Sequence, residues 1–111
     1  MRESQIEKAL VRRTNLLGGE VRKVAWIGRR GAPDRLLMFP HPVAYRLSAR
    51  RMTFDPAVAW QHPLVELKRP GEVAEDHQAR EHVRLRAAGF VVLVIDSFEA
   101  VDRWFPVEAI S

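Results

Sequence analysis

Apolar residues recur along the chain either at helical spacing or in short alternating or continuous runs. Helical spacing, shown in the first segment by Ile6 and Leu10, predicts helices over 1–18, 75–88 and 98–105. Alternating or unbroken apolar stretches predict strands over 20–27, 36–39, 64–68 and 90–95. This order of elements is typical of an α/β domain with a mixed central β-sheet flanked by α-helices.

Local signals predict where these elements begin and end. Ser4 is the expected N-cap of the first helix, and Gly89 is expected to end the second. Asp96 or Ser97 is expected to cap the last helix. The run 90–95 is almost wholly apolar, which favours a central strand covered on both faces.

The segment between Pro40 and Pro63 has the weakest pattern. Within it, 43–47 is a candidate strand. Trp60 has two interpretations, packing in the core and stacking on an unpaired base. His41 and His62 flank predicted turns, and the segment offers too few ligands for a zinc site.

Composition is typical of one soluble globular domain, with 111 residues, 47% hydrophobic and 29% charged. The chain has no cysteine, which allows a reducing cytoplasm. No apolar run near 18 residues and no signal peptide are present, so we expect neither membrane insertion nor secretion. A net charge of +4 and a pI near 10.3 indicate an anionic partner, and a solubilising surface is the alternative.

Candidate chemistry gathers around Glu66 and Lys68, which alternation places on one side of a strand while Val65 and Leu67 face a core. Pro33 can open the strand that follows it, which leaves Asp34 at the strand mouth. If the two strands are neighbours, the two carboxylates converge, and at about 4 Å they repel by roughly 4 kcal/mol. A hard divalent cation such as Mg²⁺ is the simplest means of offsetting that repulsion.

Two further features have more than one interpretation. The turn from Gly28 to Gly31 can present Arg29, Arg30 and amide hydrogens to a phosphate, or it is a plain solvated turn. Glu7 follows Ser4 by three residues, so it is either the partner in a capping box or an inward-facing carboxylate near the candidate site.

An ordered set of motifs resembles a known family. Gly31-Ala32-Pro33-Asp34 is followed by Glu66-Leu67-Lys68 and by Gln78 on a helix, with Glu7 on the first helix. This set resembles the PD-(D/E)xK nucleases, and most closely the VRR-NUC domain family. The resemblance runs from about Glu3 to Phe105, interrupted between Pro40 and His62. It implies a restriction-endonuclease-like core in a single domain, 1–111, with 41–62 as an extended hairpin.

The resemblance also implies a metal-dependent active site. Asp34, Glu66 and the Leu67 carbonyl would bind Mg²⁺ or Mn²⁺, with Glu7 acting directly or through water. Lys68 would hold the attacking water or stabilise the developing negative charge. The residues implied in catalysis are Glu7, Asp34, Glu66, Lys68 and Gln78, the last orienting Lys68.

The implied activity is hydrolysis of DNA phosphodiester bonds by a structure-specific endonuclease of a phage or a bacterium. Small stand-alone members resemble Holliday junction resolvases of DNA repair, so a four-way junction and a homodimer are expected. The expected DNA contacts are Arg29, Arg30, Arg50, Arg51 and Arg69. Two alternatives stay open: a non-cleaving nucleic-acid-binding module that retains the fold, and a basic scaffold protein in which Asp34, Glu66 and Lys68 form a structural ion-pair network.

Overall fold

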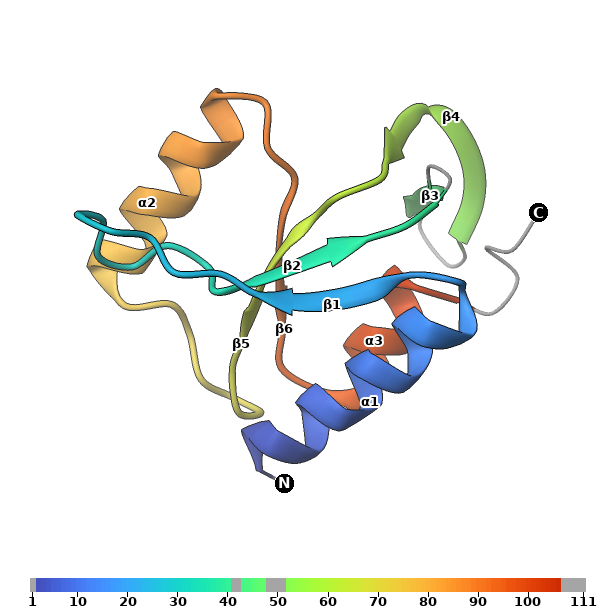
Figure 1. Cartoon of the computed structure of the whole chain (residues 1–111), viewed down its shortest axis with the longest axis horizontal. Helices are drawn as coiled ribbons and strands as arrows, with labels where there is room; N and C mark the ends of the chain where they lie inside the picture. Colours follow the sequence, from blue (N-terminus) through green and yellow to red (C-terminus); the bar gives the residue numbers. More distant parts are fainter. Residues whose placement is uncertain (1, 41–42, 48–51, 107–111) are drawn as a thin grey trace.

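The computed structural model describes residues 2–40, 43–47 and 52–106, with side chains for 2–40 and 61–106. Figure 1 shows the arrangement of three helices and six strands in these parts. In chain order the elements are α1 (Glu3–Leu16), β1 (Glu20–Lys23), β2 (Arg35–Met38), β3 (Val43–Leu47), β4 (Met52–Trp60), β5 (Leu64–Leu67), α2 (Asp76–Ala87), β6 (Val92–Ile95) and α3 (Phe98–Trp104).

Four strands form a mixed sheet in the order β1-β2-β5-β6. The pairs β1/β2 and β2/β5 are antiparallel, whereas β5 and β6 run parallel and are joined through α2. A parallel pair needs such a crossover connection, and a helix commonly provides it. The mixed sheet flanked by helices was predicted from the sequence.

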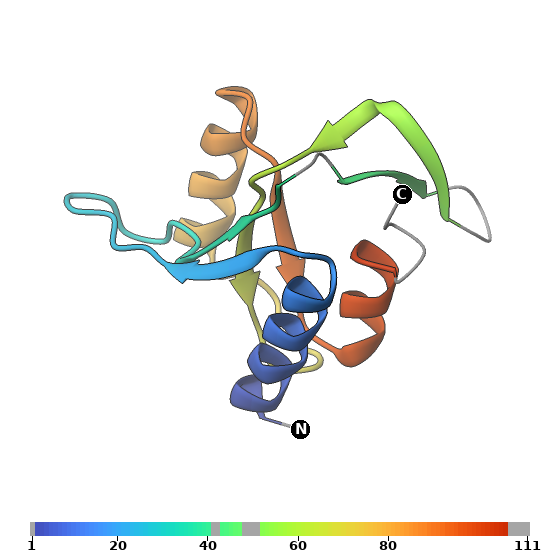
Figure 2. The same cartoon turned by 45° about the vertical axis from the view of Figure 1, so that its right-hand side comes forward.

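Helices cover both faces of this sheet (Figures 1 and 2). The larger core lies under α1 and α3, where Ile6 and Leu10 pack against Leu37, Val65 and other buried side chains. A smaller core of Leu64, Leu85 and Val92 lies under α2. Alternate residues of β5 therefore face different helices. Val65 and Leu67 face α1 and α3, which leaves Glu66 on the side of α2.

The prediction that 90–95 is a central strand was wrong. β6 lies at the edge of the four-stranded sheet and pairs with β5. It is apolar because α2 packs on one face and the larger core on the other, so that Val92 and Leu93 are buried in different clusters. Helices, rather than strands on both sides, account for the apolar sequence.

Ser4 is not the N-cap of α1, because the helix begins at Glu3 and its N-cap is Arg2, two residues before Ser4. The Gln5 side chain accepts a hydrogen bond from the Arg2 amide at 2.7 Å. Glu7 is therefore free of the capping role that its spacing from Ser4 suggested. In α3 the cap is Ser97, whose Oγ accepts from the Ala100 amide at 3.0 Å.

One strand is shorter than the sequence pattern predicted. β1 ends at Lys23, so the segment from 24 to 34 is a long loop instead of a strand end and a four-residue turn.

In the segment after Pro40, the predicted strand 43–47 is present and pairs with β4 in a separate two-stranded sheet. Among the described helices, none is long and apolar enough to cross a membrane.

Candidate active site

Asp34 and Glu66 face each other across two neighbouring strands. β2 and β5 are antiparallel, with Arg35 opposite Val65 and Leu36 opposite Leu64. Continuing this register by one residue brings Asp34 opposite Glu66. Side chains directly opposite in an antiparallel pair have Cβ atoms about 4.5–5.5 Å apart. The strands are neighbours, as the predicted convergence required, and the charge of Asp34 helps to raise the pKa of Glu66.

The Glu66 carboxylate lies in a confined setting, with 12% of its side chain exposed. Burial raises its pKa from 4.5 to about 7, because removal from water disfavours the charged form. The Lys68 ammonium opposes this shift, whereas the carboxylates of Asp34 and Glu3 add to it. Arg35 also lowers the pKa of Glu66. Carboxyl groups of Asp34, Glu3 and Glu66 thus act on one another at this end of β5.

Lys68 follows β5 directly and is buried, with an exposed fraction of 8%. Its Nζ donates to Gln78 Oε1 on α2 at 2.7 Å. The same oxygen accepts from the Glu75 amide at 3.0 Å, within the N-terminal turn of α2. Two donors on one oxygen fix the orientation of the Gln78 amide. The start of α2 therefore holds the Lys68 ammonium beside Glu66.

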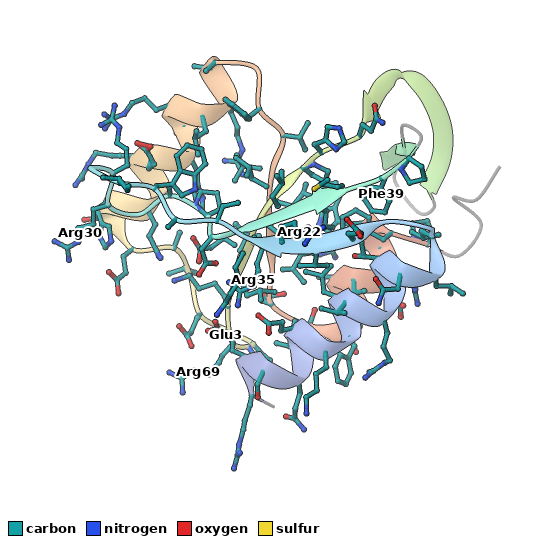
Figure 3. All side chains as sticks on the ribbon, in the orientation of Figure 1. Glu3, Arg22, Arg30, Arg35, Phe39 and Arg69 are labelled. Atoms are coloured by element: carbon teal, nitrogen blue, oxygen red, sulfur yellow. The ribbon has the colours of Figure 1, made fainter. Side chains whose placement is uncertain are left out.

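Arg35 joins Glu7 and Asp34. Its Nε donates to Glu7 Oε2 at 2.8 Å, and its Nη1 lies 2.9 Å from Asp34 Oδ1. The guanidinium is nearly buried, at 9% exposure. Arg35 thus connects Glu7 to Asp34, and its positive charge offsets part of the repulsion among the carboxylates. In Figure 3, Arg35, Glu3 and Arg69 follow one another downward from the middle of the molecule toward the start of α1.

His82 completes the surroundings of Glu66 from the side of α2. Its Nε2 lies 3.6 Å from Glu66 Oε1, and the imidazole is 3% exposed. This nitrogen is buried without a hydrogen-bond partner among the described residues. Burial and the charges of Arg86 and Lys68 lower the pKa of His82, so the neutral form is favoured.

No model of a protein family matches the chain. The sequence is 39% identical over 97 residues, 87% of this chain and 85% of the other, to the protein named "Putative nuclease p44" of Acyrthosiphon pisum secondary endosymbiont phage 1. A solved structure described as a VRR_NUC domain is 36% identical, covers 90% of this chain and 89% of its own, and superposes with a TM-score of 0.65. The chain belongs to the VRR-NUC family.

Membership of the VRR-NUC family supports a nuclease, and the α/β fold agrees with that of the solved family member. Divalent cations are usual in nucleases of this fold. Within the described residues, no group of three or more His, Cys, Asp or Glu side chains is arranged to hold a metal ion. Mg²⁺, however, is commonly bound through one or two carboxylates with water and substrate phosphate oxygens. The facing carboxylates of Asp34 and Glu66 fit this mode of binding.

The arginines expected to contact DNA lie in different parts of the VRR-NUC domain. Arg29 and Arg30 lie on the long loop before β2, and Arg29 Nε is 3.9 Å from Glu81 Oε2 on α2. Arg69, in the turn after β5, is exposed and pairs with Glu72. Arg50 and Arg51 lie outside the described residues, so their predicted role stays a prediction.

Two members of this VRR-NUC site, Arg35 and His82, were not found from the sequence, although each leaves a signal there. Arg35 alternates with Leu37 and Phe39, so it points into the core under α1 and needs a carboxylate partner there. His82 follows Gln78 by four residues, which places both on the face of α2 that meets the sheet. The four-residue spacing from Gln78 therefore predicts that His82 faces the sheet, which the five-residue spacing from His77 does not reveal.

Proposed function

We propose that this chain is a metal-dependent deoxyribonuclease that hydrolyses phosphodiester bonds, with residues 1–111 as one nuclease domain extended at 41–62. The observation that supports the proposal is the antiparallel pairing of β2 with β5, whose register, continued by one residue, would set Asp34 opposite Glu66. Beside this pair lies the Lys68 ammonium, held by Gln78. Two facing carboxylates and a buried, oriented lysine form a site suited to phosphoryl hydrolysis.

Asp34 and Glu66 would hold Mg²⁺ or Mn²⁺, together with the main-chain carbonyl of Leu67. When bound, the cation supplies polarisation of the phosphate and acidifies a bound water. Lys68 donates hydrogen bonds to the attacking water or to the charge that develops on the phosphate. Gln78 keeps the ammonium oriented through its hydrogen bond of 2.7 Å. Glu7 supports Asp34 through Arg35, or contacts the cation through water.

A branched DNA, such as a four-way junction, is the proposed substrate. The chain of 111 residues has a net charge of +4, and its arginines can contact phosphates without reading bases. A junction carries two scissile strands related by a two-fold axis. A homodimer with one site in each subunit would match that symmetry.

Cleavage assays test the chemistry and the substrate separately. Labelled four-way junction, flap, splayed-arm and linear duplex DNA are incubated with Mg²⁺ or Mn²⁺, with EDTA as the control. Glu66→Ala protein is run beside the wild type, and so is Glu72→Ala, which removes an exposed carboxylate from the turn after β5. Binding of each DNA is measured in parallel.

Paired, symmetric cuts confined to the junction and lost with EDTA and with Glu66→Ala would support a dimeric resolvase. Metal-dependent cuts on flaps or ends would keep the proposed chemistry and reject the proposed substrate. DNA binding without metal-dependent cleavage of any substrate would overturn the nuclease and favour a non-cleaving binding module. Equal loss of cleavage in the Glu72→Ala control would show that Glu66 has no special role.

A further inference from the structure

The loop between β1 and β2 projects from the body of the protein on the side of α2 (Figure 1), and Figure 2 shows it extending past that helix. At its end stands Ile27, which is 99% exposed. Single exposed apolar side chains are common on protein surfaces. This one is distinctive because it occupies the tip of a projecting loop and is followed closely by Arg29 and Arg30.

The tip of this loop is a defined turn. The Arg29 amide donates to the Trp26 carbonyl at 3.3 Å, and Gly28 between them has a φ of +79°. A glycine with positive φ at the third position of such a turn leaves the second residue, Ile27, at the corner. The Trp26 indole nitrogen donates to the Pro33 carbonyl at 2.8 Å, which ties the two sides of the loop together.

The base of the loop is fixed against the candidate active site. Gly31 lies so close to α2 that a Cβ atom there would be 2.9 Å from His77 Cδ2 and 3.1 Å from Gln78 Cα. On the other side, the Val24 amide donates to the Asp34 carbonyl at 3.0 Å. The loop is therefore joined at its base to the residue that orients Lys68 and to one of the facing carboxylates.

We propose that Ile27 is a wedge that enters DNA at an interrupted or branched stack, while Arg29 and Arg30 contact the flanking phosphates. The proposal rests on the proposed nuclease function and names the element by which the enzyme would recognise branched DNA. Proteins that deform DNA commonly insert an apolar side chain such as Ile between base steps. The cost of unstacking is smallest where stacking is already broken, so a wedge favours a branch over a continuous duplex.

The arginines beside Ile27 favour nucleic acid as the partner over a second copy of this chain. A basic flank around an apolar tip matches the phosphates on both sides of an opened base step. A second copy paired through this tip would set the same arginines against each other, so the homodimer proposed above would use another surface. Ile27 contributes no buried surface to the folded chain, so its contact surface is fully available to DNA.

The test compares Ile27→Ala with Val73→Ala, a matched variant that trims another exposed apolar side chain outside the loop. Both are made in the full chain, alone and combined with Glu66→Ala so that binding is measured without cleavage. Dissociation constants are measured for a four-way junction and for a linear duplex of equal length. A junction with 2-aminopurine at the branch reports unstacking by its fluorescence, and sedimentation reports the oligomeric state.

Ile27→Ala is expected to weaken junction binding about tenfold, with duplex binding unchanged within about twofold, the scale of contribution expected for one inserted apolar side chain. It is also expected to remove the 2-aminopurine signal, whereas Val73→Ala changes neither. Arg29→Ala is expected to weaken binding to both DNAs and to reduce the salt dependence. The melting temperature of Ile27→Ala should equal that of the wild type, because no core contact is lost.

A wild-type protein with no preference for the junction, or an Ile27→Ala variant with an unchanged preference, would overturn the wedge. So would a change in oligomeric state with no change in the 2-aminopurine signal, which would assign Ile27 to a protein contact. The proposed function fails separately. If Ile27 determines junction binding but the protein cleaves no DNA, the wedge stands and the nuclease falls. If cleavage requires Glu66 but junction binding and cleavage are unchanged in Ile27→Ala, the nuclease function stands and the wedge is rejected.

Discussion

His82 Nε2 lies 3.6 Å from Glu66 Oε1, between α2 and β5, and both side chains are largely buried. The pKa of Glu66 is raised to about 7 and that of His82 is lowered, so burial favours the neutral form of each. In the metal-free protein, this contact therefore joins two side chains whose charged forms are both disfavoured by burial. This arrangement makes stability sensitive to pH near neutrality.

The first prediction concerns the free energy of unfolding of the metal-free protein. A raised pKa means that folded Glu66 holds its proton where the unfolded chain has released it. The stabilisation that Glu66 gives the folded state by binding this proton is fully present below pH 4.5 and is lost as pH rises through about 7. The expected loss is about 2–3 kcal/mol. His82, whose pKa is lowered, contributes stability above its ordinary value of 6.5 that is lost on acidification.

Urea unfolding in EDTA from pH 4.5 to 8.5 measures this effect. Glu66→Gln should remove the fall in stability toward pH 8, whereas Glu72→Gln, at an exposed site, should follow the wild type. The charged groups that act on Glu66 are present in both variants, so the comparison of the two variants isolates the share of Glu66. Those groups are Asp34, Arg35, Lys68 and Glu3. An identical pH profile for Glu66→Gln and the wild type would contradict the prediction.

Much of this site follows from sequence because its geometry is local to strands. Alternation alone separates Glu66 from Val65, and proline before Asp34 marks the start of the neighbouring strand. The Lys68 to Gln78 hydrogen bond joins residues ten apart, across one turn and the start of a helix. The catalytic roles themselves came from the family resemblance and stay predictions.

Other features depend on contacts that sequence spacing does not reveal. Arg35 pairs with Glu7 across 28 residues, and only the packing of α1 on β2 brings them together. The edge position of β6 was missed because two helices can bury a strand as well as two neighbouring strands can. Ser4 is a residue type that commonly caps helices, yet the N-cap is Arg2, two residues earlier, where the Gln5 side chain accepts from the Arg2 amide.

The second prediction concerns Gln78, which accepts from Lys68 Nζ at 2.7 Å. Gln78→Ala leaves a buried ammonium without this acceptor, so the free energy of unfolding should fall by about 1–3 kcal/mol. Misorientation of Lys68 should lower kcat by about tenfold to hundredfold, with a smaller change in KM. Chemical unfolding and single-turnover cleavage measure the two effects.

Gln61→Ala is the matched control for Gln78. Its Nε2 donates to the Phe39 carbonyl at 2.9 Å, so the variant also loses a partly buried glutamine hydrogen bond. It should lower stability and leave kcat unchanged. Gln78→Glu, which keeps an acceptor for Lys68, should recover most of the stability. A Gln78→Ala enzyme with wild-type kcat would show that the lysine does not depend on this contact.

The third prediction concerns the Arg35 guanidinium, which bridges Glu7 and Asp34. Arg35→Met keeps much of the buried volume and removes the charge that holds two carboxylates near Glu66. Because both partners are partly exposed, the loss of stability should be moderate, about 1–3 kcal/mol. Arg35→Lys should recover only part of it, because an ammonium cannot reproduce the forked geometry.

Arg22→Ala provides the control for Arg35, because Arg22 forms an ion pair with Glu20 at 2.9 Å on the exposed edge of the sheet. Exposed pairs of this kind contribute about 0–1 kcal/mol, so this variant should unfold close to the wild type. Urea unfolding at low and high salt measures both. Equal stability of Arg35→Met and Arg22→Ala would mean that the Glu7 to Asp34 bridge is dispensable.

The fourth prediction concerns the close approach of the long loop to α2 at Gly31. Its φ is +86°, and a Cβ atom there would be 2.9 Å from the His77 carbonyl oxygen and 3.1 Å from Gln78 Cα. These are backbone atoms that cannot rotate away, so Gly31→Ala must displace the start of α2 or the loop. The variant should lose about 1–3 kcal/mol of stability and at least tenfold in kcat, since Gln78 moves with the helix.

Gly89→Ala separates this steric effect from backbone strain. Gly89 follows the other end of α2 with a φ of +96°, yet nothing lies within 4 Å of a Cβ atom placed there. It should lose about 1–2 kcal/mol through the left-handed conformation alone and retain full kcat. Thermal unfolding and single-turnover cleavage of both variants decide the matter. If Gly31→Ala cleaves DNA as fast as Gly89→Ala, the close contact between the loop and the start of α2 does not determine the position of Gln78.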